Sequence, residues 1–70
     1  MNEFIERWEY DSSGRLLYYG QAEPGSSPNS EKWMIEKYEY SGANETAKKY
    51  PNGSNANMFI WNNRATYNYS

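Results

Sequence analysis

Ile35-Glu36-Lys37-Tyr38-Glu39-Tyr40-Ser41 repeats an earlier stretch, Ile5-Glu6-Arg7-Trp8-Glu9-Tyr10-Asp11, with conservative changes at three positions. Each copy runs into a short polar turn, Asp11-Ser12-Ser13-Gly14 in the first and Ser41-Gly42-Ala43-Asn44 in the second. Gly and Asn tolerate a positive φ better than other residues. We therefore expect Gly14 and Asn44 to close equivalent turns. The chain is interpreted as one β-hairpin pattern used twice, followed by a shorter tail.

The alternation of side chains in the repeat indicates strands. In each copy two aromatic residues share one face with a glutamate, Glu6 or Glu36, and a mixed-charge pair, Arg7/Glu9 or Lys37/Glu39, lies on the other. We expect the aromatic face to be the internal core. Residues 15–21 are the expected return strand of the first hairpin, and their apolar side chains on both faces predict a central strand or one that another chain covers. Residues 23–30 form a polar loop between the two hairpins. The four predicted core aromatics are Trp8, Tyr10, Tyr38 and Tyr40.

The tail is less regular. We expect residues 45–50 to form a second return strand that ends at Pro51. For residues 58–63 we expect a single helical turn capped by Asn57, with a short buried strand as the alternative. Residues 65–69 alternate and predict a last edge strand. The predicted fold class is all-β: a small antiparallel sheet of about five strands within a single β-rich domain, residues 1–70.

Composition narrows the function classes. The chain has 70 residues with no Cys and no His, so disulfides, thiolate chemistry and histidine ligands or bases do not arise. The net charge is −2 and the basic residues are scattered, which disfavours nucleic acid. No stretch approaches the ~18 apolar residues of a membrane span, and the first residues lack a signal-peptide pattern. We therefore expect no nucleic-acid partner, no membrane association and synthesis in a cytoplasm.

Glu6 and Glu36 are the residues that most resemble catalytic groups. They occupy equivalent places in the repeat, and paired carboxylates can perform acid/base chemistry. Strand glutamates beside tyrosine hydroxyls and cations are, however, ordinary polar neighbours. The glycines have no phosphate-binding spacing, and a single aspartate does not make a calcium loop. We expect no catalytic residue, no cofactor and no metal, and hence no enzyme.

The aromatic content is the strongest functional signal. Eight Tyr, three Trp and two Phe stand in a chain whose mean hydropathy is −1.17. A small domain without disulfide or metal gains stability by association, and Tyr and Trp are enriched at protein interfaces. We expect the aromatics outside the shared repeat face to bind partner proteins. They are Tyr18, Tyr19, Trp33, Trp61, Tyr67 and Tyr69.

Two family resemblances bear on these residues. Residues 10–16, Tyr-Asp-Ser-Ser-Gly-Arg-Leu, resemble the Tyr-Asp repeat of Rhs-type shell proteins, whose unit is a hairpin. The motif covers about a tenth of the chain. The second copy departs from it, with Ser41 in place of the aspartate and Asn44-Glu45-Thr46 in place of Gly-Arg-Leu. This resemblance implies the hairpin, and it does not imply a repeat-built shell.

The longer resemblance is to small proteins encoded by tailed bacteriophages. It is carried by Leu17-Tyr18-Tyr19-Gly20 with Ala22-Glu23-Pro24-Gly25, by residues 33–40 and by residues 59–67. It implies a non-enzymatic structural subunit of the virion, in the capsid, neck, tail or fibre, assembled with other virion proteins. The alternative from the residues themselves is a small carbohydrate-binding or adhesion module that uses exposed Trp and Tyr.

Overall fold

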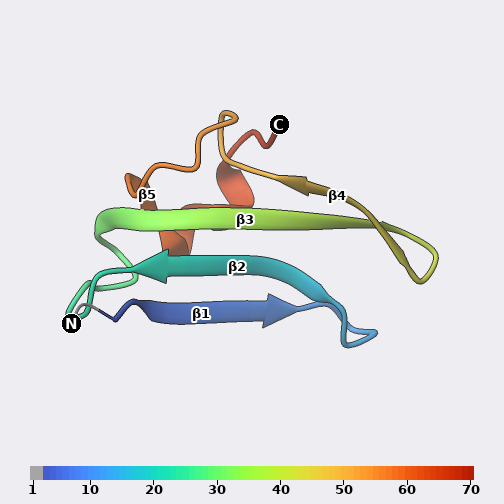
Figure 1. The fold of residues 1–70 in the computed structure, drawn as a ribbon, viewed down its shortest axis with the longest axis horizontal. Coiled ribbons are helices and arrows are strands. Elements are labelled where there is room, and N and C mark those ends of the chain that lie inside the picture. The colour runs from blue at the N-terminus through green and yellow to red at the C-terminus, as the bar shows by residue number, and fades with distance from the viewer. Residues whose placement is uncertain (1–2) are drawn as a thin grey trace.

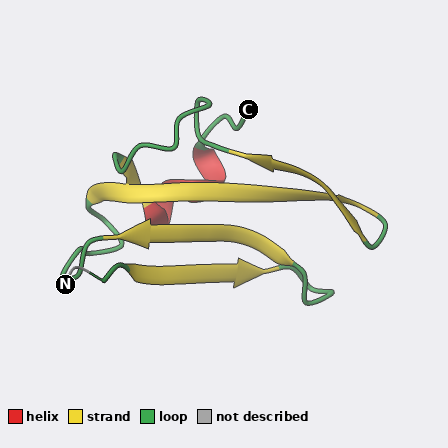
Figure 2. Cartoon of the chain, in the orientation of Figure 1, coloured by secondary structure: helices red, strands yellow, loops and turns green. Residues whose placement is uncertain are grey.

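The computed structural model describes residues 3–70, and its main element is an antiparallel sheet (Figure 1). Four strands neighbour one another in chain order: β1 (Ile5–Tyr10), β2 (Leu16–Ala22), β3 (Glu31–Ser41) and β4 (Asn44–Lys49). The short β5 (Phe59–Ile60) also pairs with β3, and the 3-10 helix η1 (Trp61–Thr66) follows it. The all-β class is confirmed, with η1 as the helical element of the described chain (Figure 2).

The first hairpin forms as predicted. The amide of Gly14 donates to the carbonyl of Asp11 at 3.0 Å, and the amide of Asp11 donates to the carbonyl of Arg15 at 2.8 Å. Gly14 has a φ of +83°, a value that costs glycine little. The Asp11 carboxylate accepts hydrogen bonds from the amides of Ser13 and Arg15, each at 2.9 Å. The Arg15 amide is the main reason why the pKa of Asp11 lies below its ordinary value.

The second hairpin turns differently, and the prediction of a positive φ at Asn44 is wrong. Ser41 pairs directly with Asn44, so that Gly42 and Ala43 alone form the loop. The positive φ of +61° belongs to Gly42. Glycine at the first of two loop residues is typical of a type II′ turn, whose twist matches that of the flanking strands. Because the loop has only two residues, the residue with positive φ is Gly42, two positions earlier in the chain than the expected Asn44.

The register of the strands defines two faces of the sheet. Trp8 lies opposite Tyr19, and Tyr19 lies opposite Glu36, so these side chains share a face. Gly20 lies opposite Ile35 on the other face. In Figure 1, η1 passes behind β3 toward β2 and lies on that second face. The buried cluster formed there consists of Tyr18, Ala22, Trp33, Ile35, Phe59 and Trp61.

The core therefore lies on the opposite face from the one predicted. Trp8 and Tyr10 are 50% and 57% exposed, so the prediction that they form the internal core is wrong. Tyr38 and Tyr40 are half-buried on the same face as Trp8. The tail packs on the face that carries the small residues Gly20 and Ala22, because only there can a large ring approach the sheet closely.

Gly20 makes this close approach possible. A Cβ at this position would lie 2.5 Å from Cε3 of Trp61 and 3.2 Å from Cε3 of Trp33. The two indole rings pack with their centroids 5.9 Å apart, and Nε1 of Trp33 donates to the carbonyl of Ser27 at 2.9 Å. The absence of a side chain at Gly20 thus lets Trp61 lie directly on β2.

The tail differs from the expected helix and strand. The helical turn begins at Trp61 and not at Met58, and its N-terminus has no side-chain cap. Asn57 instead donates from Nδ2 to the carbonyl of Gln21 at 3.1 Å. Residues 65–69 do not form the predicted edge strand, since η1 extends to Thr66 and only Tyr69 forms a bridge, to Pro51. The hydroxyl of Tyr67 accepts a hydrogen bond from the amide of Ile60 at 2.9 Å, and this contact folds the chain end back onto β5.

Candidate functional site

The candidate site is the sheet face that the tail leaves uncovered, called here the open face. It carries the aromatic residues of both repeat copies together with one aromatic residue of β2. It also carries the two glutamates that are equivalent in the repeat. The members are Glu6, Trp8, Tyr10, Tyr19, Glu36, Tyr38 and Tyr40.

Each repeat glutamate accepts a hydrogen bond from a tyrosine on this face. The hydroxyl of Tyr19 donates to Glu6, and the hydroxyl of Tyr38 donates to Glu36. Partial burial raises the pKa of both tyrosines, and the carboxylate acceptors raise it further because they stabilise the protonated hydroxyl. Both phenols therefore stay neutral and fixed in orientation at physiological pH. Glu6 and Glu36 thus orient tyrosine rings.

Cations complete the open face beside the rings. The Arg15 guanidinium lies 4.9 Å from the centroid of Tyr40, whose hydroxyl donates to the carbonyl of Leu16 at 2.6 Å. Lys48 lies 5.9 Å from the centroid of Tyr38, and its Nζ is 4.0 Å from Glu36. Each tyrosine is thereby held in place by charged neighbours. Trp8 differs, because among the described residues it packs against one aromatic ring, that of Tyr19, at 5.8 Å between centroids and 53° between planes.

The six predicted partner contacts fall into two groups. Tyr18, Trp33 and Trp61 are buried within the chain, so they offer little surface to a partner in this fold. Tyr19, Tyr67 and Tyr69 are half-buried. Tyr19 belongs to the open face, whereas Tyr67 and Tyr69 pack against the core from the tail. The structure does not bring the six together on one surface.

Arg64 is an important residue that the sequence did not reveal. Its Nε lies 2.7 Å from Oε1 of Glu9, and its guanidinium lies 4.6 Å from the centroid of Trp61. The hydroxyl of Tyr69 donates to the carbonyl of Arg64 at 2.6 Å. Arg64 therefore joins the tail to β1. The only local signal is an arginine three positions after a tryptophan, and nothing near it in sequence indicates Glu9 as its partner.

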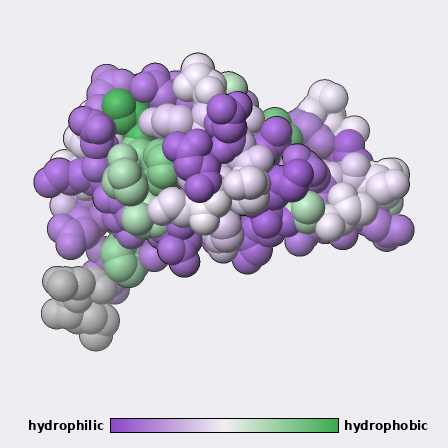
Figure 3. All heavy atoms as spheres, turned by 90° about the horizontal axis from the view of Figure 1, so that it is seen from above, coloured by the Kyte–Doolittle hydropathy of each residue, from purple (hydrophilic) through white to green (hydrophobic). Residues whose placement is uncertain are grey.

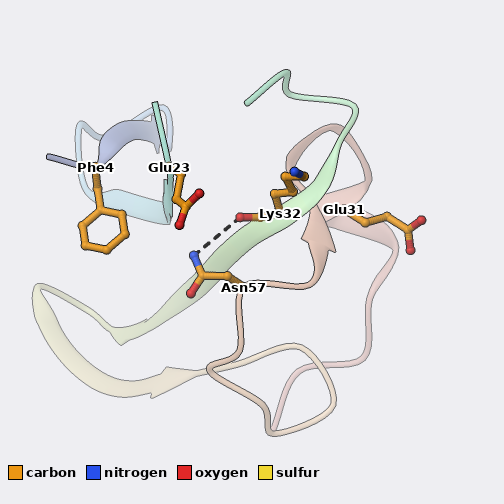
Figure 4. Close-up of a pocket in the computed structure, with 5 residues that line it drawn as sticks. All are labelled: Phe4, Glu23, Glu31, Lys32 and Asn57. Carbon is orange, nitrogen blue, oxygen red and sulfur yellow. Dashed lines mark hydrogen bonds between the residues drawn. The ribbon is translucent and has the colours of Figure 1, made fainter. Parts of the chain in front are cut away.

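A shallow depression of about 540 Å³ lies at the end of the sheet near Phe4. In Figure 4, Phe4 and Glu23 come from one side and Asn57 from the other, while the charged ends of Glu31 and Lys32 point away from Phe4. The side-chain amide of Asn57 donates a hydrogen bond from Nδ2 to the backbone carbonyl of Lys32. These charged groups do not converge on one point, and the repeat glutamates are not among the lining residues. The depression offers no arrangement for acid/base chemistry.

The face of the molecule that Figure 3 shows, seen from above, is mainly polar. A small hydrophobic area on this face lies toward the end where β5 is found. Met58, which precedes β5, is 55% exposed. Within residues 3–70, no group of three or more acidic side chains is placed to hold a metal ion. No helix in the same range is both long enough and apolar enough to span a membrane.

No family model, curated protein or solved structure matches this chain significantly.

Proposed function

We propose that this chain is a non-enzymatic assembly subunit that binds a neighbouring protein through its open face. The observation that carries the proposal is the exposure of Trp8 and Tyr10, at 50% and 57%, on a face whose other aromatic residues are fixed. Large exposed rings next to oriented tyrosines and arginine match the composition of interface centres. The resemblance to small tailed-phage proteins favours the virion as the assembly, with other virion proteins as the partners.

The geometry favours a protein partner over a carbohydrate. Sugar-stacking sites use coplanar exposed rings, whereas Trp8 and Tyr19 are tilted by 53°. The hydroxyls of Tyr19 and Tyr38 already donate to Glu6 and Glu36. The carbohydrate-binding alternative rests on the exposure of Trp8 and Tyr10. Retention of the chain on a glycan column, lost in Trp8→Ala, would favour that alternative.

The proposal is tested in purified particles of the virus that encodes the chain. We expect mass spectrometry to find the chain in a fixed ratio to the other virion proteins. Trp8→Ala and Tyr38→Ala should reduce incorporation, because interface energy is concentrated in a few Trp, Tyr and Arg residues. Met58→Ala removes an exposed side chain away from the open face and is the matched control. Absence of the chain from purified particles would refute the virion assignment.

A further inference from the structure

The outer edge of β1 is a free strand edge. This strand ends the sheet on one side, and no described segment lies beyond it in Figure 1. An uncovered edge exposes a row of unpaired backbone N–H and C=O groups. Natural edges are usually protected by charged side chains, lysine above all, by proline or by a bulge of the edge strand itself. β1 has no Lys or Pro, its charged residues are of both signs, and at its one irregularity the extra residue, Leu17, belongs to β2.

The hydrogen bonds of the first turn show which residues of β1 face outward. The amide and carbonyl of Asp11 both point toward the return strand. Because backbone groups alternate along a strand, those of Glu9 and Arg7 also point inward. Those of Glu6, Trp8 and Tyr10 therefore point outward, away from β2. The residues whose backbone is free are the same residues whose side chains lie on the open face.

We propose that β1 pairs antiparallel with β1 of a second copy of this chain, centred on Trp8. In this register Trp8 faces Trp8 of the second copy in a hydrogen-bonded pair, and Glu6 faces Tyr10 of the second copy. On the other face, Arg7 lies opposite Glu9 of the second copy, and the reverse pair forms by symmetry. A two-fold axis perpendicular to the sheet generates this arrangement and makes one continuous sheet from two chains.

Charge complementarity selects this register over its neighbours. A shift in one direction places Arg7 opposite Arg7, and a shift in the other places Glu9 opposite Glu9, and like charges directly opposite destabilise a sheet. Arg7 is exposed and forms no ion pair within the described chain. Glu9 uses Oε1 for Arg64, which leaves Oε2 for a second cation. The Glu6–Tyr10 pair repeats the carboxylate–tyrosine contact that Glu6 and Glu36 already make on this face.

The opposite edge of the sheet lacks these features. β4 consists of Asn44-Glu45-Thr46-Ala47-Lys48-Lys49 and has no aromatic residue to bury. Its two lysines are of the kind that prevents edge pairing. The β1 edge, in contrast, would cover Trp8 and Tyr10, which are among the most exposed large side chains in residues 3–70. Pairing through β1 concerns a strand edge and a copy of the chain itself, so it goes beyond the proposed binding of other proteins.

Sedimentation velocity at a series of protein concentrations tests the inference. We expect the wild-type chain to form a dimer and Glu6→Pro to be monomeric, because proline removes one outward N–H without affecting the inward ladder to β2. Glu45→Pro is the matched control. Since Asn44 pairs inward with Ser41, the next amide, that of Glu45, faces outward on the other edge. We expect this variant to remain dimeric.

Arg7→Glu supplies a second test that leaves the backbone unchanged. It replaces both Arg7–Glu9 attractions by repulsions, and we expect the dimer dissociation constant to rise by about tenfold or more. Added salt should weaken the wild-type dimer and strengthen the Arg7→Glu dimer, since salt screens exposed charges. A wild-type chain that stays monomeric overturns the inference, as does a dimer insensitive to both Glu6→Pro and Arg7→Glu. Either result leaves the particle-incorporation test of the proposed function unaffected.

Discussion

Gly20→Ala should destabilise the fold, although glycine is a weak strand residue. Replacing glycine by alanine where the backbone permits it stabilises a protein by about 0.4–1 kcal/mol through the unfolded chain. Here the new methyl group would lie 2.5 and 2.6 Å from Cε3 and Cζ3 of Trp61. Trp61 is 4% exposed and Trp33 is fully buried, so neither ring can move into solvent. Overpacking of this kind costs typically about 1–3 kcal/mol.

The overpacking term exceeds the gain in the unfolded state. We expect a net loss of about 1–2 kcal/mol in the free energy of unfolding, which corresponds to a fall in Tm of about 4–16 °C for a domain of this size. Urea unfolding followed by tryptophan fluorescence and thermal melting by circular dichroism measure the two quantities.

A double-mutant cycle identifies the cause. Trp61→Phe removes the fused six-membered ring to which the contacting carbons Cε3 and Cζ3 belong. Gly20→Ala should therefore cost less in the Trp61→Phe background than in the wild type, with a coupling of about 0.5–3 kcal/mol. If Gly20→Ala is as stable as the wild type or more stable, the close approach of Trp61 does not determine stability and the reasoning is wrong.

Three further predictions concern folding alone. Trp33→Ala should cost about 3–5 kcal/mol because its ring is fully buried, whereas Trp8→Ala, half exposed, should cost about 1 kcal/mol or less; equal losses in urea titrations would contradict the assignment of the two faces. Gly14→Val should cost about 1 kcal/mol or more because its φ is +83°, and a melt with no loss relative to Ser13→Val would contradict it. The pKa of Asp11 in the folded chain lies below its ordinary value of 3.8, so Asp11 stabilises the fold above about pH 4, and this contribution is lost as the pH falls further. The Tm of Asp11→Asn should therefore fall less steeply with acid than the Tm of the wild type. Equal slopes of Tm against pH in the two proteins would rule the contribution out.

The sequence was informative wherever the determining interaction is local. The repeat, its alternation and the turn at Asp11 predicted β1 and the first hairpin, because side chains within a few residues decide both. The second turn was placed correctly at residues 41–44, but its positive φ was expected at Asn44 and is found at Gly42. A two-residue loop and a longer bulged loop both suit Ser41-Gly42-Ala43-Asn44, and the choice depends on how β3 and β4 pair. The polar loop at residues 23–30 was also correct.

The choice of the covered face could not be predicted from alternation. A period of two shows that Trp8, Tyr10, Tyr38 and Tyr40 share a face, but it does not show which face another segment will cover. That choice is made by contacts of long range, such as Trp61 on Gly20 and Arg64 on Glu9. As a result, Trp33 and Trp61, expected at a partner surface, are buried, and Trp8 and Tyr10, expected in the core, are exposed. A glycine within a strand rich in tyrosine was the available signal that a large ring approaches there.

The tail that covers β2 and β3 is synthesised last, and this affects how the growing chain folds. Glu9 meets Arg64 only after 55 further residues have been made. The hairpins can form as they leave the ribosome, but Trp33 and Ile35 stay uncovered until residues 59–66 emerge. During that interval the nascent sheet exposes apolar surface on the face that is later buried, and such surface promotes aggregation. A molecular chaperone would therefore meet this chain on the face opposite to the one that the folded protein leaves open.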